Sequence, residues 1–320
     1  MAGAFSTTIE RALAAPLGIP ASELAGMLRY DDACWWAEAR QAADALKRRY
    51  GLTATLPRAL IETSNVCRKD CLYCGIRRSN AGVRRYRLTH DEVLACVDAA
   101  RHRGYPALAF QAGEIESEEN TAFYERLLRE TAGEFEVTLS LGEQSAEVYR
   151  RWREAGALRY LLRIETADRG LYSRIHPREC SYDRRVECLR ELKRLGYVTG
   201  TGVMIGLPGQ DAASLAADLV FMGELGADMV GMGPYIPHPA APLGGGTADA
   251  LELSLRMITL ARLYLHRVNI VAATALSVLD PAEGRQRALA AGANVIMDEF
   301  TPAACRREYD LYPGKGASSS

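Results

Sequence analysis

Short apolar runs alternate with longer amphipathic stretches along most of the chain. From residue 59 onward, each brief, nearly continuous apolar run is followed by a stretch in which apolar residues recur at helical spacing. Continuous apolar runs are typical of parallel strands that are buried on both faces. The strands are expected at residues 59–65, 107–113, 136–142, 159–166, 199–207, 229–236, 270–278 and 294–300. The helices are expected at residues 91–103, 119–132, 145–154, 182–195, 212–225, 249–265, 282–291 and 302–311.

Eight strand–helix units predict the α/β class and a (β/α)8 TIM-type barrel. The alternative, a doubly wound sheet, would have to be open, and no nucleotide-binding fingerprint follows the first strand. Three short amphipathic segments precede the barrel, at residues 5–50. We therefore expect an N-terminal helical cap over one end of the barrel at residues 1–58, the barrel at 59–313, and a disordered tail at 314–320.

Composition and charge narrow the function classes. Hydrophobic residues make up 48% of the 320 residues, which is ample for a buried core. The 39 basic and 40 acidic residues nearly cancel, so no nucleic-acid partner is indicated. No apolar run is long enough for a membrane span, and residues 1–20 lack the pattern of a targeting segment. We expect a cytoplasmic protein without a membrane partner.

The candidate chemistry starts with three cysteines directly after the first predicted strand. Cys67, Cys71 and Cys74 have the spacing C-x3-C-x2-C. Each iron of a [4Fe–4S] cluster is normally held by one cysteine, so three cysteines leave one iron open. A closed zinc site, the alternative, needs four ligands. The remaining cysteines have no ligand spacing and are expected to be buried thiols: Cys34, Cys96, Cys180, Cys188 and Cys305.

Polar residues at the ends of other strands are further candidates, because active sites of such barrels lie at the carboxyl ends of the strands. An ordinary turn is the alternative for the residues after the second strand, and a structural ion pair for those after the fourth. His238 is more simply explained by a structural or solvated role. The candidates are Gln111, Gly113 and Glu114 after the second strand, Arg163 and Glu165 after the fourth, Met204 in the fifth, Tyr235 and His238 after the sixth, and Thr274 in the seventh.

Arginines crowd the segment that follows the cysteines. We expect most of them to form a solvated face, with one or two as candidates to hold an anionic substrate or to offset the negative charge of a cluster. They are Arg77, Arg78, Arg84, Arg85 and Arg87.

The cysteine spacing after the first strand of a barrel resembles the radical S-adenosylmethionine (radical SAM) superfamily. The resemblance implies an oxygen-sensitive enzyme in which SAM chelates the open iron and is cleaved by one electron to a 5′-deoxyadenosyl radical. It also implies a low-potential electron donor such as ferredoxin or flavodoxin. Glu114 is then expected to meet the SAM ammonium, Glu165 the ribose hydroxyls and Arg185 the SAM carboxylate. The full set of implied SAM-binding residues is Tyr73, Gln111, Gly113, Glu114, Arg163, Glu165, Arg185 and Met204.

A closer resemblance is to the HydE family of [FeFe]-hydrogenase maturases, more than to biotin synthase or methylornithine synthase. It implies an iron–cysteine substrate carrying CO and cyanide, made by HydG, and a product used to build the diiron centre on HydF. It places Thr274 in the substrate cavity, with Tyr235 and His238 as weaker candidates. The motifs that carry it lie at residues 67–78, 85–88, 111–114, 139–143, 206–210, 234–239 and 311–315.

Some positions depart from that family. Ala112, Ile164 and Ala273 stand where family members often have Ser, His and Thr, which removes hydrogen-bonding groups from the expected cavity. No cysteine follows Lys315, so no second cluster is expected. A paralogue acting on another small sulfur-containing or amino-acid substrate, and a non-catalytic iron–sulfur carrier or assembly scaffold, are the alternatives.

Overall fold

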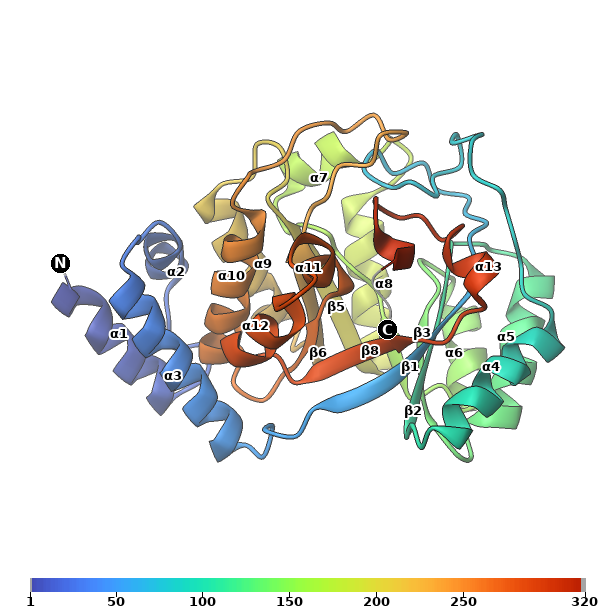
Figure 1. Cartoon of the computed structure of the whole chain (residues 1–320), viewed down its shortest axis with the longest axis horizontal. Coiled ribbons are helices and arrows are strands. Elements are labelled where there is room, and N and C mark those ends of the chain that lie inside the picture. Colours follow the sequence, from blue (N-terminus) through green and yellow to red (C-terminus); the bar gives the residue numbers. More distant parts are fainter. Residues whose placement is uncertain (1, 318–320) are drawn as a thin grey trace.

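Eight parallel strands pair in chain order and close into a barrel, with β8 hydrogen-bonded to β1. A computed structural model of the chain describes residues 2–317 (Figure 1). The closed barrel confirms the predicted fold and excludes the doubly wound alternative. The strands are β1 (Leu56–Ser64), β2 (Ala107–Ala112), β3 (Glu136–Ser140), β4 (Arg159–Leu161), β5 (Val198–Ile205), β6 (Met229–Pro234), β7 (Asn269–Ala272) and β8 (Val295–Glu299).

Helices surround the barrel, and several of them begin at polar caps. The Thr89 and Glu92 side chains form the predicted capping box at the start of α4. Ser117, Ser145 and Ser181 accept backbone N–H groups at the next starts of this kind. The barrel helices are α4 (His90–His102), α5 (Glu118–Thr131), α6 (Ala146–Glu154), α7 (Arg169–Ile175), α8 (Tyr182–Arg194), α9 (Ala212–Glu224), α10 (Ala250–Leu265), α11 (Thr274–Leu279), α12 (Gly284–Ala291) and α13 (Ala303–Arg306).

Two predicted strands are much shorter than expected. The fourth ends at Leu161, because the chain turns at Glu165, whose φ is 68°. The seventh ends at Ala272, and the apolar residues that follow form the short helix α11 instead. An apolar run of this length can be buried equally well as strand or helix, so its pattern does not separate the two. The helix α7 was not predicted, and the last predicted helix is reduced to α13.

The three predicted N-terminal helices are present: α1 (Ala2–Ala14), α2 (Ala21–Leu28) and α3 (Ala33–Arg49). They do not lie over an end of the barrel as expected. Instead α3 packs against α10 and α12, and α2 packs against α9, so the segment flanks the barrel (Figure 1). The apolar residues of α3, including the buried Trp36, determine this position because they are covered by the outer faces of the barrel helices.

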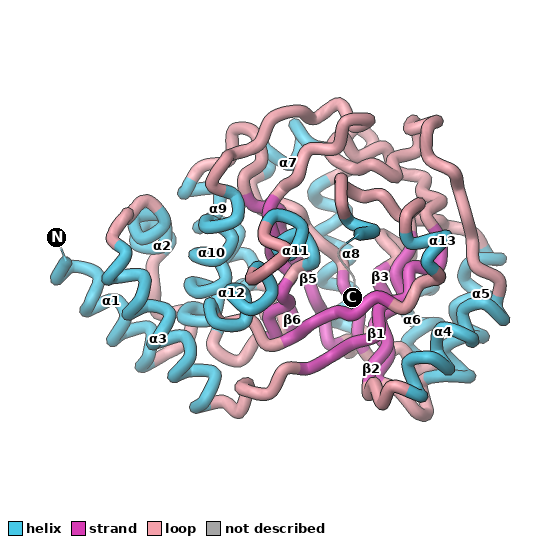
Figure 2. The backbone as a smooth tube through the Cα atoms, in the orientation of Figure 1, coloured by secondary structure: helices cyan, strands magenta, loops and turns pink. Residues whose placement is uncertain are grey.

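Long loops gather at one end of the barrel (Figure 2). They include the cysteine segment after β1 and the segment between β6 and α10. Among the residues that the structure describes, no helix is both long and apolar enough to cross a membrane.

The prediction of a disordered tail at residues 314–320 is wrong for residues 314–317, which the structure describes. Lys315 opens the 3₁₀-helix η1 (Lys315–Ala317) and is 5% exposed. Its ammonium lies 2.5 Å from Oε1 of Glu62 on β1 and 3.5 Å from Oε2 of Glu299 on β8. A buried carboxylate needs such a partner, which explains why the chain returns here. Residues 318–320 lie outside the described residues.

We predict that Lys315→Met lowers the free energy of unfolding by about 3 kcal/mol at pH 9 and by less at pH 6. Burial raises the pKa of Glu62 from 4.5 to about 8 despite the Lys315 ammonium. The burial of Glu62 therefore costs stability increasingly as the pH rises from 4.5 through about 8, and Lys315 offsets that cost. Chemical denaturation at both pH values measures the difference. Lys193→Met, at a half-exposed ion pair, is the control and should cost less than about 1 kcal/mol.

Candidate active site

A cavity of about 320 Å³ opens at the carboxyl ends of the strands. It is lined by the cysteine segment, by the ends of the strands and by residues close to the C-terminus. All the sequence-predicted site residues except His238 line it: Cys67, Cys71, Tyr73, Cys74, Gln111, Gly113, Glu114, Arg163, Glu165, Arg185, Met204, Tyr235 and Thr274.

Backbone contacts hold the cysteine segment against β2. The Gly113 N–H donates to Ser64 O at 3.0 Å, and the Arg68 N–H donates to Glu114 O at 2.8 Å. A Cβ at Gly113 would lie 2.3 Å from Val66 O and 2.8 Å from Cys67 Cβ. Only glycine fits here, because it lets the cysteine segment approach the end of β2 closely.

The three thiols line one cavity and are largely buried. Burial raises the pKa of Cys67, and it raises that of Cys74 to about 12. The pKa of Cys71 is raised first by a hydrogen bond with the thiol of Cys180 and second by burial. Metal ligation requires thiolates, so loading a cluster here must release protons. The contact of Cys180 with a predicted ligand was not foreseen, because Cys180 is distant in sequence.

The other cysteines outside the C-x3-C-x2-C motif differ in exposure. Cys96 and Cys188 are buried as predicted, and so is Cys180. Cys34 is exposed and Cys305 is partly exposed, so the prediction was wrong for these two.

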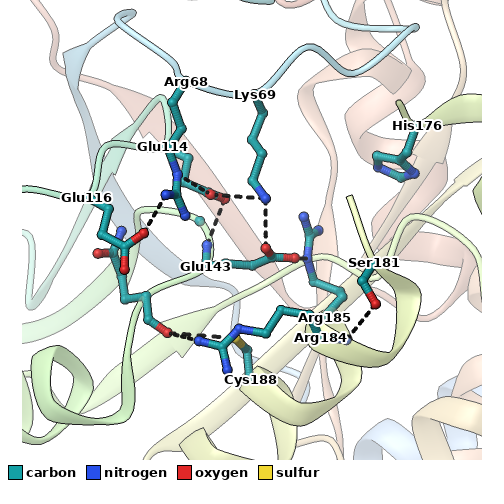
Figure 3. A network of polar contacts seen from close by, with 12 residues as sticks. Arg68, Lys69, Glu114, Glu116, Glu143, His176, Ser181, Arg184, Arg185 and Cys188 are labelled. Atoms are coloured by element: carbon teal, nitrogen blue, oxygen red, sulfur yellow. Dashed lines mark hydrogen bonds and ion pairs between the residues drawn. The ribbon is translucent and has the colours of Figure 1, made fainter. Parts of the chain in front are cut away.

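A buried ionic network joins the cysteine segment to β2, β3 and α8 (Figure 3). The Lys69 ammonium lies 2.8 Å from Glu143 Oε2 and 3.3 Å from Glu114 Oε1. Arg68 Nε donates to Glu114 Oε1 at 2.9 Å, and the Glu143 N–H donates to Glu114 Oε2 at 2.8 Å. Arg185 Nε donates to Glu143 Oε1 at 2.6 Å. Cationic side chains from the cysteine segment and from α8 thus bind the two buried carboxylates of Glu114 and Glu143.

The network changes the expected roles of two residues. Both carboxylate oxygens of Glu114 already accept hydrogen bonds from the protein, and Arg185 already binds Glu143 and the Arg163 carbonyl. These side chains therefore hold the cavity wall together. Sequence analysis did not select Lys69 or Glu143, although Glu143 follows the third strand as the other candidates follow theirs.

Opposing effects act on the pKa of Glu143. Burial alone raises it, whereas the charges of Arg185 and Lys69 lower it, and the net pKa lies below the usual value of 4.5. The carboxylate is therefore ionised at neutral pH and stabilises both cations.

Arg163 and Glu165 form an ion pair across the cavity wall. Arg163 Nε lies 3.0 Å from each carboxylate oxygen of Glu165, and Arg163 Nη2 donates to Val203 O at 2.8 Å. Glu165 has a left-handed backbone, with φ of 68°, which is unusual for a residue other than glycine. Such conformations concentrate at functional sites, where surrounding contacts hold them.

Residues near the C-terminus form another wall of the cavity, which sequence analysis did not assign to the site. The hydroxyl of Tyr309 is hydrogen-bonded to the side chain of Gln111, and that of Tyr312 to Thr274. Lys315 lines the same cavity. The barrel topology brings these residues together, and no local spacing indicates it.

Two predicted positions lie outside the cavity. His238 is buried, its Nε2 lies 2.9 Å from Asp310 Oδ2, and its Nδ1 accepts the Ala240 N–H at 3.0 Å. It therefore has a structural role. Ile164 is fully buried in the hydrophobic core, so it does not remove a polar group from the cavity wall. Ala112 and Ala273 do line the cavity.

The arginines after the cysteines are engaged within the protein. Arg77 pairs with Asp70 at 2.8 Å, and Arg87 pairs with Glu119 at 3.3 Å. Arg85 donates to the carbonyl groups of Asn65 and Ile76 at 2.7 and 2.8 Å, which fixes the path of the segment.

Comparison with known proteins agrees with this geometry. The model of the Radical SAM superfamily matches residues 61–222. The chain is 44% identical over 278 residues to the [FeFe] hydrogenase maturase subunit HydE of Thermotoga maritima, which covers 85% of this chain and 78% of that protein.

Solved structures support the fold. Methylornithine synthase (PylB) superposes with a TM-score of 0.81 at 24% identity, covering 90% of this chain and 85% of that one. The FeFe-hydrogenase maturase HydG from Carboxydothermus hydrogenoformans superposes with a TM-score of 0.81 at 17% identity, covering 94% and 71%.

We predict that Glu143→Gln lowers the free energy of unfolding by about 3 kcal/mol at pH 7, because it leaves two buried cations with a neutral partner. The folded pKa of Glu143 is below 4.5, so its contribution is present above pH 4.5 and is lost as the pH falls through the folded pKa. The variant and the wild type should therefore converge in acid, as measured by denaturant titration. The control Glu147→Gln, at an exposed ion pair on α6, should stay within about 0.5 kcal/mol of the wild type. A loss in Glu143→Gln that is independent of pH would contradict the argument.

Proposed function

Because this chain belongs to the radical SAM superfamily, and within it to the family of the hydrogenase maturase HydE, we propose that it cleaves SAM reductively in the assembly of the [FeFe]-hydrogenase active site. The observation that carries the proposal is the convergence of three thiols and the polar strand ends on one cavity. A pure carrier would not need that second set of residues.

The residues present fit the cofactors that the superfamily implies, a [4Fe–4S] cluster and SAM. Three thiols that line one cavity form a donor set that leaves one iron of such a cluster to an external ligand. When bound, the cluster supplies the electron that breaks a carbon–sulfur bond of SAM. Cys67, Cys71 and Cys74 would hold the cluster.

Other cavity residues would hold SAM. The residues proposed for this role are Tyr73, Gln111, Gly113, Glu114, Arg163, Glu165, Arg185 and Met204. The side chains of Glu114 and Arg185 would act mainly by fixing the wall, since the protein already occupies them.

The substrate and partners follow from the family. We propose an iron–cysteine complex as the substrate, HydG as its source and HydF as the recipient of the product. We also propose a ferredoxin or flavodoxin as the electron donor. The protein is proposed to be cytoplasmic and to hold no second cluster. Tyr235 and Thr274 line the space available to the substrate. A related enzyme with another small sulfur-containing or amino-acid substrate is the second candidate, because Ala112 and Ala273 present no polar group to the cavity.

We predict that the protein, reconstituted anaerobically with iron and sulfide, releases 5′-deoxyadenosine from SAM on addition of dithionite. Cys71→Ala should abolish both the cluster absorbance and this product, because one iron loses its ligand. Cys34→Ala, at an exposed thiol outside the cavity, should retain both. Liquid chromatography quantifies the product, and a loaded cluster that yields no 5′-deoxyadenosine would refute the enzyme assignment.

We predict that the protein replaces HydE of Thermotoga maritima in a reconstituted hydrogenase maturation that contains HydG and HydF. Hydrogen evolution by the matured hydrogenase is the measurement. A mixture lacking both this protein and HydE of Thermotoga maritima gives the background, and Cys71→Ala should match that background. SAM cleavage without hydrogenase activation would favour the second candidate.

A further inference from the structure

A buried carboxyl group on α9 faces the two turns that follow β4 and β5. Asp218 is 0% exposed. Its Oδ1 accepts the Ala167 N–H at 2.5 Å and the Thr166 hydroxyl at 3.3 Å. Its Oδ2 lies 3.5 Å from Nε2 of Gln210. Asp218 does not line the cavity itself, and sequence analysis did not select it.

Gln210 extends this contact into the second turn. Its Oε1 accepts the N–H groups of Gly206 and Leu207 at 2.7 and 3.2 Å, and its Nε2 donates to Met204 O at 3.0 Å. The side chains of Asp218 and Gln210, which do not line the cavity, therefore restrain the backbone of both turns.

Two residues of the cavity wall adjoin these turns: Glu165 precedes the Thr166–Ala167 segment, and Met204 lies at the end of β5. Glu165 has the left-handed φ of 68°. Such a backbone persists only where its surroundings hold it. On one side, the Glu165 N–H donates to Gly202 O at 2.9 Å and the Met204 N–H donates to Glu165 O at 3.0 Å. On the other side, Asp218 holds the Thr166–Ala167 segment that directly follows Glu165.

We propose that Asp218 is a positioning residue for SAM: by holding the Thr166–Ala167 segment and the Gln210 side chain, it keeps Glu165 and Met204 directed to the cavity. The inference rests on the proposed function in one respect, namely that Glu165 and Met204 contact SAM. The restraint on the two turns is independent of any ligand.

Two substitutions separate shape from hydrogen bonding. Burial raises the pKa of Asp218 to about 8, so the carboxyl group is largely neutral at pH 7. Asparagine has the same shape, is also neutral and keeps an acceptor oxygen for the Ala167 N–H. Alanine removes the acceptor and leaves that N–H buried without its partner. Asp218→Asn is therefore the conservative variant and Asp218→Ala the disruptive one.

A matched control lies at the opposite end of β5. Asp228 Oδ2 accepts the Thr199 N–H at 2.8 Å, so its carboxylate also fixes backbone next to a barrel strand. Asp228→Ala should cost stability without affecting the cavity. Gln210→Leu provides a second test at a less buried position. It removes the hydrogen bonds to Met204, Gly206 and Leu207 while Asp218 remains in place.

The first experiment is hydrogen exchange of the cluster-free protein at pH 7. In Asp218→Ala the amides of residues 164–168 should exchange about tenfold faster than in the wild type, because the Ala167 N–H loses its acceptor. In Asp218→Asn and Asp228→Ala their rates should stay within about threefold of the wild type. Unchanged protection of residues 164–168 in Asp218→Ala would overturn the inference.

The second experiment is titration of the reconstituted protein with SAM. Asp218→Ala should raise the KM for SAM about tenfold, while the iron content and the rate of 5′-deoxyadenosine release at saturating SAM change little. Gln210→Leu should raise this KM as well, whereas Asp218→Asn should restore it. An unchanged KM in Asp218→Ala and Gln210→Leu, or an equal rise in Asp228→Ala, would overturn the positioning role.

Failure of the proposed function is distinguishable from failure of this inference. If the wild type with a loaded cluster does not cleave SAM, the proposed function is wrong. The part of the inference that concerns SAM binding is then wrong as well. The exchange measurement still decides whether Asp218 restrains the two turns, because it needs neither cluster nor SAM.

Discussion

The arrangement of the site depends on one constraint: buried charges must be paired where they lie. Glu143 receives Lys69 from the cysteine segment and Arg185 from α8, and its backbone N–H binds Glu114. Removing Glu143 would leave Lys69 and Arg185 without the carboxylate that they share. A segment without regular secondary structure is thereby held in one position, and the three thiols that it carries can meet one cluster.

The same constraint explains the part of the cavity wall that residues near the C-terminus form. Glu62 lies within β1 and is fully buried, so its carboxyl group needs a polar partner that enters the barrel. Lys315 is that partner, and the tyrosines that precede it reach Gln111 and Thr274. The segment that follows the barrel is therefore part of the cavity and contributes to the space in which a substrate would bind.

Backbone conformation is the third element of the site. Glu165 adopts a left-handed turn at the end of β4, where a regular strand would direct its side chain differently. The turn is restrained by strand contacts on one side and by a buried carboxyl group of α9 on the other. Hydrogen bonds from an outer helix thus help to shape the inner wall, which no contact with a ligand would reveal.

The sequence by itself determined the barrel and singled out the three cysteines, and all but one of the site residues that it selected line the cavity, because strand periodicity and the position of a residue after its strand are local properties. It did not determine the state of those residues. Whether Glu114 is free or paired, whether Ile164 faces the cavity or the core, and whether α11 forms depend on neighbours from distant segments. Only the tertiary structure decided these points, since pairing and burial are set by contacts between elements far apart in the chain.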